Sequence, residues 1–520
     1  MSDTKVNGAV ALLKALHAGG VQICFANPGT TELVLVEALA TVPGIRPVLC
    51  LFEGVCTGAA DGYVRVSGAP PLTLLHLGPG FANGIANLHN ARRAGSGIIN
   101  LIGDHASWHL PYDAPLTSDI ESLAAPVSAM VIRLSDADTI AASAARVLAA
   151  AAETAAGPVT VILPTDVMEA DVAAGPDPVT APPSRPAVDA TRIVAAATVT
   201  ERGADTILLL GGDALAERGQ HAAAAIASKI GGRVLMEPYP AIVPLGGDLP
   251  SIERQAYFPD DVIRQMGSAD VILVGARPPI SYFGYAGYPS QLVPNDRLFC
   301  LATPEEDGVA ALESLAERLG AADHAGSVAT PRPEMSPPAA ALSPDSIVSS
   351  LIGRLPDGAI ISLEGSTLGG PWLRNARHAR RHRVMTNTGG AIGQGLPCAL
   401  GAALAAPGAR VIALQSDGSG HYTLQALWTM AREKLPVTII LAANHRYGIL
   451  QTELNRVAAP LEDPVIASLT RLDNPRADWT ALAAGYGVDA VRVATVAEFD
   501  AALERGLAMD GPLLIQAELP

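Results

Sequence analysis

The sequence has few aromatic residues and no excess of positive charge. Phe, Trp and Tyr make up 4% of the 520 residues, so hydrophobic cores must be built from Ala, Val, Leu and Ile. Such aliphatic cores are typical of parallel α/β layers. With 35 Lys and Arg against 51 Asp and Glu, the net charge is −16. We therefore do not expect a nucleic-acid-binding surface, because phosphate contacts need clustered basic side chains.

Long apolar runs and paired cysteines are also missing. No stretch approaches ~18 uninterrupted apolar residues, so no membrane span is expected, and no signal-type leader is recognised. The number of cysteines is odd, and their spacing does not resemble that of metal ligands. We therefore expect a cytoplasmic protein whose cysteines are buried free thiols. These residues are Cys24, Cys50, Cys56, Cys300 and Cys398.

Two proline-rich stretches divide the chain into three blocks. Asp171–Ala190 and Ala321–Asp345 lack periodicity, and we interpret them as linkers. The predicted domains are residues 1–172, 190–322 and 345–520. Each block alternates short apolar runs with Ala-rich amphipathic segments, which predicts βαβ units and three doubly wound parallel sheets. The first and third blocks both close with Gly-Pro and an apolar run, so the outer two domains are predicted to be related.

The segment LQSDGSGHYTLQALWTMAREKLPVTIILAANHRYGIL (residues 414–450) places an acid and an amide at the ends of two apolar strands. Because consecutive parallel strands point the same way, Asp417 and Asn444 should meet at one sheet edge. Their oxygens are hard donors that suit Mg²⁺ or Ca²⁺ and not zinc. Gly418 and Ser419 open the intervening helix, and free N–H groups at a helix start hold anions. The segment therefore predicts a metal-bridged diphosphate site, with a capping Asp and a turn Asn as the alternative.

This segment resembles the cofactor motif of the thiamine-diphosphate-dependent enzymes, in which Gly-Asp-Gly is followed one helix and one strand later by Asn-Asn. Here Ser416 replaces the leading Gly and Ala443 replaces the first Asn, and neither position is a metal ligand in the family. Three other stretches resemble, in order, landmarks of the acetolactate synthase and benzoylformate decarboxylase branch. They are FANPGTTE (Phe25–Glu32), LFEGVCTGAADGYVR (Leu51–Arg65) and NTGGAIGQGLPCALGAAL (Asn387–Leu404). The three blocks would then be pyrimidine-binding, central and diphosphate-binding domains.

The resemblance implies thiamine diphosphate and Mg²⁺ as cofactors. The metal ligands would be Asp417, Asn444 and the backbone carbonyl of Arg446, with Gly418 and Ser419 beside the diphosphate. Gly390 would accept a hydrogen bond from the aminopyrimidine, and Ile392 would be the apolar wedge between the two rings. Relatives in the synthase and oxidase branch bind FAD near LLLGGDALAERG (residues 208–219), but a lone Gly-Gly-Asp does not support FAD here.

Two residues are the candidates for acid–base chemistry. Glu53 ends the run VLCLF and begins a Gly/Ala-rich helix, and a buried Glu is rare unless it is paired or functional. By resemblance, Glu53 protonates N1′ of the aminopyrimidine. His76 ends the run LTLLH and matches a catalytic His of benzoylformate decarboxylase, where a neutral imidazole serves as general acid or base. A purely structural role is the alternative for both residues.

Five further residues are candidate substrate contacts. Thr30 matches a Ser that contacts the substrate carboxylate in benzoylformate decarboxylase, and Ile449 follows the metal-binding turn. The second catalytic His of that enzyme falls on Phe283, which argues against an identical mechanism. His105 and His109 are the nearest replacements as proton donors, although surface or core roles are an open alternative for both.

The resemblance implies decarboxylation of a small 2-oxo acid, with carboligation of the resulting carbanion or enamine to a second carbonyl. Three alternatives stay open: a simple benzoylformate-type decarboxylase, an FAD-containing synthase or oxidase, and a non-catalytic cofactor-binding paralogue. Family members place the cofactor between the first domain of one subunit and the last domain of its partner. A homodimer or homotetramer is therefore expected, with no nucleic-acid or membrane partner.

Overall fold

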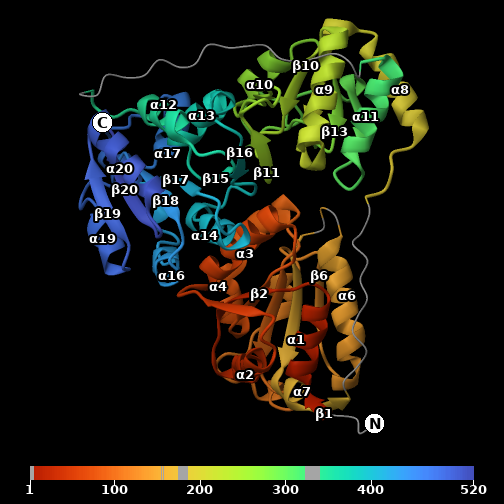
Figure 1. Ribbon diagram of the computed structural model, residues 1–520, viewed down its shortest axis with the longest axis vertical. Helices are drawn as coiled ribbons and strands as arrows, with labels where there is room; N and C mark the ends of the chain where they lie inside the picture. Colours follow the sequence, from red (N-terminus) through yellow and green to blue (C-terminus); the bar gives the residue numbers. More distant parts are fainter. Residues whose placement is uncertain (1–4, 154, 156, 174–184, 322–339) are drawn as a thin grey trace.

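The structure is a computed structural model that describes residues 5–153, 155, 157–173, 185–321 and 340–520. It is a mixed α/β protein with three parallel-sheet lobes (Figure 1). The first block forms the lower lobe, the middle block lies at the upper right, and the third block lies at the left. Within these residues, no helix is both long and apolar enough to cross a membrane.

The first sheet has six parallel strands in the order β3-β2-β4-β5-β7-β6. Helices cover both of its faces, so its strands are buried on both sides, as expected for a parallel sheet. The strands are β2 (Ile23–Asn27), β3 (Arg46–Leu49), β4 (Leu72–Leu75), β5 (Ile99–Asp104), β6 (Met130–Arg133) and β7 (Val159–Pro164). The α-helices are α1 (Gly8–Ala18), α2 (Leu33–Thr41), α3 (Glu53–Ser67), α4 (Leu77–Ala94), α5 (Ile120–Ala124), α6 (Ile140–Ala152) and α7 (Thr165–Glu169).

The third sheet has the order β11-β16-β15-β17-β18-β20-β19. Without β11 (Ile242–Leu245), this order matches that of the first sheet strand for strand, which supports the predicted relation between the outer blocks. The remaining strands are β15 (Ala359–Leu363), β16 (His382–Thr386), β17 (Val411–Ser416), β18 (Val437–Ala443), β19 (Asp489–Val493) and β20 (Leu513–Glu518). The helices are α12 (Pro344–Arg354), α13 (Ser366–Asn375), α14 (Gly395–Ala405), α15 (Asp417–Gly420), α16 (Ala426–Arg432), α17 (Gly448–Arg456), α18 (Pro464–Thr470), α19 (Trp479–Gly485) and α20 (Val496–Ala508).

The middle sheet has five parallel strands in the order β12-β10-β9-β13-β14, a doubly wound order that reverses between β9 and β13. Its strands are β9 (Thr206–Leu210), β10 (Arg233–Met236), β12 (Glu253–Arg254), β13 (Asp270–Val274) and β14 (Leu298–Ala302). Its helices are α8 (Ala190–Thr200), α9 (Glu217–Ile230), α10 (Pro259–Met266) and α11 (Gly308–Leu319).

Helices α3 and α14 pack the first and third blocks together with little space between their backbones. A Cβ on Gly401 would lie 1.9 Å from the Ala59 carbonyl oxygen, and one on Gly62 would lie 2.2 Å from the Cys398 carbonyl oxygen. Next to this crossing, the buried Arg65 guanidinium donates to the Thr386 carbonyl at 2.8 Å. The two blocks therefore share one hydrophobic core.

Two sequence-based expectations were wrong. The start of the first predicted linker is not irregular: β8 (Asp171–Ala173) pairs antiparallel with β1 (Lys5–Asn7), a pairing of distant segments that local periodicity does not reveal. Cys300 is exposed and only the other four cysteines are buried, because β14 turns this side chain away from the sheet interior. Most of the second predicted linker lies outside the described residues.

Candidate active site

The candidate residues gather at the carboxyl edges of the outer sheets. In each outer sheet the strand order has a reversal near its centre, between β2 and β4 in the first and between β15 and β17 in the third. Ligands of doubly wound folds bind at such switch points. His76 follows β4, and Asp417 follows β17. The fold therefore presents two candidate half-sites, one on each outer sheet.

Asp417 is buried at the start of the four-residue helix α15. Its carboxylate accepts the backbone N–H of Gly418 at 2.8 Å and that of His445 at 2.6 Å. Burial raises the pKa of the Asp417 carboxyl, and these two hydrogen bonds lower it by a smaller amount. A cation bound to this carboxylate would offset the cost of burying its charge.

Asn444 follows β18, the neighbour of β17 in the sheet, and therefore lies at the same edge as Asp417. The residue between Asn444 and Arg446 is His445, which has a left-handed φ of 53° and turns the chain sharply there. Asn444 Oδ1 accepts the N–H of Arg446 at 3.2 Å, and its Nδ2 donates to Thr367 at 3.3 Å.

These donors fit Mg²⁺ in chemistry. One carboxylate, one amide and one backbone carbonyl are oxygen donors, which Mg²⁺ prefers, and it normally adds water and phosphate oxygens. Among the described residues no cluster of three or more His, Cys, Asp or Glu forms a protein-only metal site. The site thus suits a metal ion that a bound diphosphate helps to hold.

A second strip of the third block, residues 387–395, is held in place by side chains from two directions. The buried Glu364 carboxylate accepts the backbone N–H groups of Gly393, Gln394 and Gly395 at 2.7 to 2.9 Å. From the first block, Asn90 on α4 both donates to and accepts from the backbone of Ala391. The strip is therefore rigid before any ligand binds.

Gly390 and Ile392 of this strip are the predicted ring contacts. Gly390 has a φ of +79°, and a Cβ there would lie 1.8 Å from the Tyr282 hydroxyl, so the Tyr282 side chain fills the space that a larger residue would need. Ile392 is 36% exposed although it is large and apolar. Gln415 joins the strip to α15, because its Nε2 donates to Glu364 at 2.8 Å and to Ser419 at 2.7 Å. These positions fit the predicted pyrimidine and diphosphate contacts.

Glu53 lies at the first turn of α3 and is 8% exposed. Asn83 donates to its Oε2 at 3.1 Å. A Cβ on Gly80 would lie 3.0 Å from Glu53 Oε1 and 3.2 Å from the His76 Cβ, so Glu53 and His76 are neighbours across Gly80. The first half-site therefore contains a buried carboxylate beside an imidazole.

The candidate substrate residues lie at several places. Thr30 is exposed at the edge of the first sheet, whereas the hydroxyl of Thr31 is the one near His76, at 3.5 Å. His105 and His109 contact each other edge to face, with ring centroids 5.5 Å apart. They share the loop after β5 with the exposed Trp108 and Tyr112. Phe283 and Ile449 are half-exposed, on the middle and third blocks.

Helix α4 contacts both Glu53 of the first half-site and the strip of residues 387–395. Along α4, Glu53 is hydrogen-bonded to Asn83, whereas Ala391 is hydrogen-bonded to Asn90. An α-helix rises about 1.5 Å per residue, so roughly 10 Å separates these two contacts. The two contacts thus lie at different points along α4, and between them Asn87 donates to the carbonyls of both Gly54 and Gly393.

Sequence reasoning missed several residues that shape these half-sites. Glu32, Glu364 and Asn90 are buried polar side chains whose partners lie distant in sequence or on another block. Glu32 could have been identified from the sequence, because in FANPGTTE it follows a predicted apolar strand and a buried Glu is unusual. Nothing in the sequence pointed to Tyr282 as the neighbour of Gly390.

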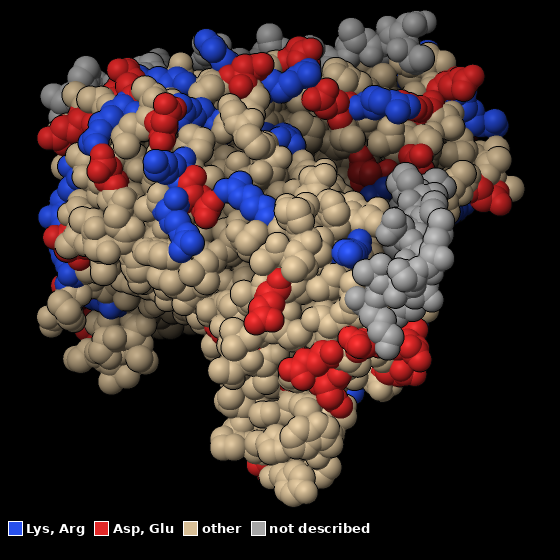
Figure 2. Space-filling model, turned by 60° about the horizontal axis from the view of Figure 1, so that its bottom comes forward, with Lys and Arg blue, Asp and Glu red and all other residues tan. Residues whose placement is uncertain are grey.

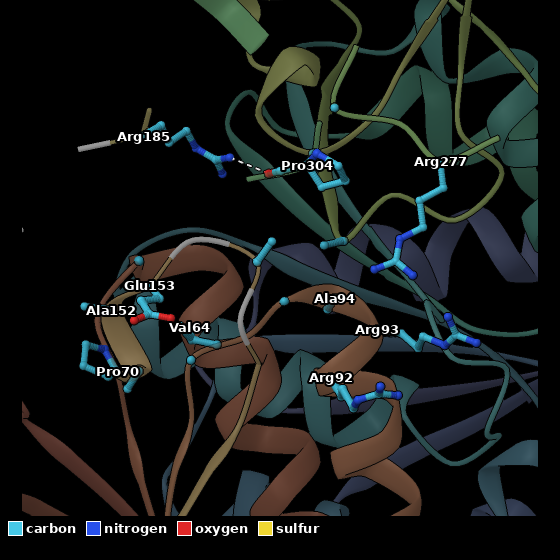
Figure 3. A pocket seen from close by; sticks show the side chains of 18 of the residues that line it. Val64, Pro70, Arg92, Arg93, Ala94, Ala152, Glu153, Arg185, Arg277 and Pro304 are labelled. Carbon is cyan, nitrogen blue, oxygen red and sulfur yellow. Dashed lines mark hydrogen bonds between the residues drawn. The ribbon is translucent and has the colours of Figure 1, made fainter. Parts of the chain in front are cut away.

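A separate pocket of about 700 Å³ lies between the first and middle blocks. Figure 3 shows Arg185 and Arg277 on its middle-block side, above Arg92 and Arg93 at the end of α4. Gly212, which follows β9 at the switch point of the middle sheet, also lines the pocket. The pocket is thus a basic recess at the carboxyl edge of a doubly wound sheet.

Two acids, Glu153 and Glu237, line this pocket, and Glu237 directly follows β10. Its carboxylate accepts the N–H of Gly212 at 3.2 Å. Burial raises the pKa of Glu237 to about 7, while the Gly212 hydrogen bond and the Arg277 charge lower it by less. Within the described part of the chain, Arg92, Arg93 and Arg277 have no salt-bridge partner.

Comparison with known proteins agrees with this geometry. Residues 6–123 match the family model of the thiamine pyrophosphate enzyme N-terminal TPP binding domain, and residues 370–517 match that of the C-terminal TPP binding domain. The chain is 42% identical over 520 residues to IlvX of Mycobacterium tuberculosis, which carries the name of an acetolactate synthase large subunit, with 99% of each chain covered. It is 29% identical to benzoylformate decarboxylase of Pseudomonas aeruginosa, with 97% of each covered.

A solved structure shows the same architecture. The 4-hydroxybenzoylformate decarboxylase of Rhodococcus jostii RHA1, described as thiamine diphosphate-dependent, superposes with a TM-score of 0.86 at 26% identity and 99% coverage of both chains. The two sheet-edge half-sites lie within the two matched family models, apart from the strand β15 and its Glu364. The chain therefore belongs to the thiamine pyrophosphate enzyme family, in the branch related to acetolactate synthases and benzoylformate decarboxylases.

Proposed function

We propose that the protein is a Mg²⁺- and thiamine-diphosphate-dependent decarboxylase of a 2-oxo acid. In this proposal it also joins the product of decarboxylation to a second carbonyl compound. The observation that supports this most is the pair of half-sites at the switch points of two related sheets. One offers a buried carboxylate beside an imidazole, and the other offers oxygen donors beside a glycine strip.

Each half-site has a distinct task in this proposal. Asp417, Asn444 and the Arg446 carbonyl hold the metal ion, and Gly390 and Ile392 hold the ring system of the cofactor. When bound, thiamine diphosphate supplies the nucleophilic carbon that attacks the 2-oxo group and stabilises the charge left by decarboxylation. Glu53 holds a proton at the pyrimidine nitrogen, and its low exposure keeps water from competing for that nitrogen.

His76 is the proposed general acid or base toward the substrate. It lies at the edge of the first sheet next to Glu53 and is partly exposed, so a ligand can reach it. Thr30, His105 and His109 line the same edge and are the proposed substrate contacts of the first half-site. Phe283 and Ile449 are the proposed contacts beside the glycine strip.

The deciding experiment is product analysis with a panel of aliphatic and aromatic 2-oxo acids, in the presence and absence of an aldehyde acceptor. CO₂ release with an aldehyde as the sole product identifies a simple decarboxylase. A 2-hydroxy ketone or 2-hydroxy-2-alkyl-3-oxo acid product identifies a carboligase. If thiamine diphosphate binds but no member of the panel loses CO₂, the catalytic assignment is wrong and a cofactor-binding paralogue replaces it.

We further propose that the complete site forms between two copies of the chain. Both carboxyl edges carry large exposed apolar side chains: Leu51, Trp108 and Tyr112 on the first sheet, and Tyr422 and Leu450 on the third. Figure 2 also shows a largely uncharged surface over the lower part of the molecule, with several acidic groups that gather mainly toward its right-hand side. Exposed apolar surface of this kind marks an interaction site, and a twofold partner would cover both edges at once.

An FAD-containing synthase is the second candidate, and the basic pocket of the middle block is the observation that favours it. Three of its arginines, which have no salt-bridge partner among the described residues, fit a ligand with phosphate groups: Arg92 and Arg93 from the end of α4 and Arg277 from the middle block (Figure 3). Purified protein with a flavin absorption band, which Arg277→Ala removes, would support this candidate. Colourless protein that takes up no FAD in equilibrium dialysis would exclude it.

A further inference from the structure

The carboxylate of Glu32 is completely buried at the switch point of the first sheet. Glu32 ends the short 3-10 helix Thr30–Glu32, which follows β2. Its Oε2 accepts the N–H of Gly29 at 2.8 Å and lies 2.8 Å from His76 Nδ1. Its Oε1 accepts the hydroxyl of Thr31 at 2.8 Å. A buried carboxylate is costly without hydrogen-bond donors, and this one accepts from the Gly29 N–H and the Thr31 hydroxyl in addition to its contact with His76.

The chemistry of this contact fixes the proton on the histidine. An ionised carboxylate can only accept hydrogen bonds, so the His76 nitrogen that faces Glu32 must be the one that carries the hydrogen. A neutral His76 is then protonated at Nδ1 and has its lone pair at Nε2. We propose that Glu32 is a positioning residue that holds His76 in this tautomer, with Nε2 free to take a proton from the substrate side.

The backbone around the pair leaves the imidazole little freedom. A Cβ on Gly29 would lie 2.1 Å from His76 Nδ1, so the ring packs directly on the glycine backbone. A Cβ on Gly103 would lie 2.0 Å from Glu32 Oε1, so the backbone of β5 packs directly against the carboxylate. Leu77, directly after His76, has an unusual left-handed φ of 49°. Strain at a non-glycine residue next to a functional side chain is typical of positions where the fold fixes its direction.

A purely structural role for Glu32, as the cap of the 3-10 helix, would require fewer contacts than Glu32 makes. The hydrogen bond to Gly29 caps the 3-10 helix, and that contact alone requires only one carboxylate oxygen. The contacts with Thr31 and His76 go beyond capping, and the contact with His76 joins two residues that are 44 positions apart in sequence. The inference rests on the proposed function only in that His76 would use Nε2 in catalysis. The tautomer itself does not depend on activity.

Solid-state ¹⁵N spectra of sedimented protein labelled at the histidine ring nitrogens test the tautomer. The His76 signals are identified as those missing from His76→Gln. We expect a protonated Nδ1 and an unprotonated Nε2 in the wild-type protein. Glu32→Gln should produce Nε2–H signal, because a carboxamide can donate to Nδ1 as well as accept from it. Glu32→Asp keeps the charge and should restore the wild-type pattern at least in part.

Asp104→Asn is the matched control, since Asp104 is also a fully buried carboxylate at this sheet edge but pairs with Arg133. It should leave the His76 signals unchanged. An Nε2–H tautomer in the wild-type protein would overturn the proposal, and this measurement needs no variant to fold. Unchanged signals in folded Glu32→Gln would overturn it as well.

Kinetics separate this proposal from the proposed function. With the best substrate of the panel, Glu32→Gln should lower kcat by roughly 10–100-fold, as loss of an orienting partner typically does, with KM changed less than about threefold. If the tautomer changes but kcat does not, Glu32 positions His76 and the catalytic role of His76 is wrong. If kcat falls while the tautomer is unchanged, the positioning role of Glu32 is wrong.

Discussion

Asp417 is the single residue on which the proposed metal site depends most. It supplies the one negatively charged ligand, and its burial makes that charge costly without a cation. We expect Asp417→Asn to weaken binding of Mg²⁺-thiamine diphosphate by more than ~100-fold in calorimetry, because the amide cannot offset the charge of the metal ion. Without cofactor, the variant avoids the cost of a buried charge but loses one of the two backbone N–H bonds that the Asp417 oxygens accept, so we expect it to fold with a similar or slightly lower melting temperature.

Asp463→Asn is the control for this measurement. Asp463 also accepts backbone N–H groups at a helix start of the third block, but its side chain is exposed and lies outside both half-sites. Its replacement should leave cofactor affinity unchanged. Equal affinity of Asp417→Asn and the wild-type protein would remove Asp417 from the metal site.

Glu237 predicts a pH dependence of stability in the middle block. Because burial raises the pKa of its carboxyl from 4.5 to about 7, the folded protein binds this proton more tightly than the unfolded chain does. The stabilisation is therefore complete below pH 4.5 and is lost as pH rises through about 7. Relative to Glu237→Gln, the free energy of unfolding of the wild-type protein should fall by roughly 1–3 kcal/mol across this window.

Urea unfolding of the wild-type protein and Glu237→Gln at several pH values between 4.5 and 8 tests this expectation. The glutamine can still accept the N–H of Gly212, so the comparison isolates the ionisable proton. A difference between the two proteins that stays constant over this range would show that the Glu237 carboxyl titrates normally.

The positions of some site residues could be predicted from the sequence, and the contacts of others could not. Asp417, Asn444 and Glu53 each follow an apolar run, and the carboxyl ends of parallel strands collect ligand-binding residues, so their positions at sheet edges could be anticipated. The partnership of Glu32 with His76 could not, because it depends on how β2 and β4 pair in space. The individual site roles stay proposals.

At the level of elements, the crossing of α3 and α14 predicts a strong effect of one added methyl group. Gly401→Ala would place a Cβ against the Ala59 carbonyl oxygen, which belongs to the backbone and cannot move aside easily. We expect a loss of roughly 1–3 kcal/mol or more in the free energy of unfolding, as is typical of overpacked cores, measured by urea or thermal unfolding.

Gly353→Ala, on another helix, is expected to change the free energy of unfolding in the opposite direction. Gly353 lies within α12, and a Cβ there would have no neighbour within 4 Å. Alanine should stabilise the protein by roughly 0.5–1 kcal/mol, because it loses less conformational freedom on folding than glycine does. Equal effects of the two substitutions would mean that helix propensity, and not the contact between α3 and α14, controls stability at Gly401.

The elements that the sequence predicted well were those with strong local patterns. The Ala-rich helices and buried strands of all three blocks follow the expected alternation, and the outer sheets share one strand order. The exceptions are β8 and β11, each of which pairs antiparallel with a strand from a distant segment. Because such pairings depend on the packed fold and not on local periodicity, no window of the sequence could reveal them. The exact domain boundaries stay a prediction.

At the scale of the whole molecule, one chain holds both half-sites, which contact α4 at different points along its length. Glu53 is hydrogen-bonded to Asn83 near the start of α4, and the glycine strip contacts the other end of that helix. Both carboxyl edges expose apolar side chains that a second chain would cover. The arrangement therefore predicts an oligomer, at least a dimer, in which the first block of one subunit completes the site on the third block of its partner.

Subunit mixing tests this arrangement with two inactive variants. Glu53→Gln damages the first half-site, and Asp417→Asn damages the second. If the complete site spans two chains, a mixed dimer has one site with both substitutions and one site with neither. After full exchange of equal amounts, half of the dimers are mixed, so about a quarter of the wild-type decarboxylase activity should return. If the site instead lay within a single chain, every site in the mixture would carry one substitution and no activity would return. An active monomer in light scattering at micromolar concentration would also contradict the shared site.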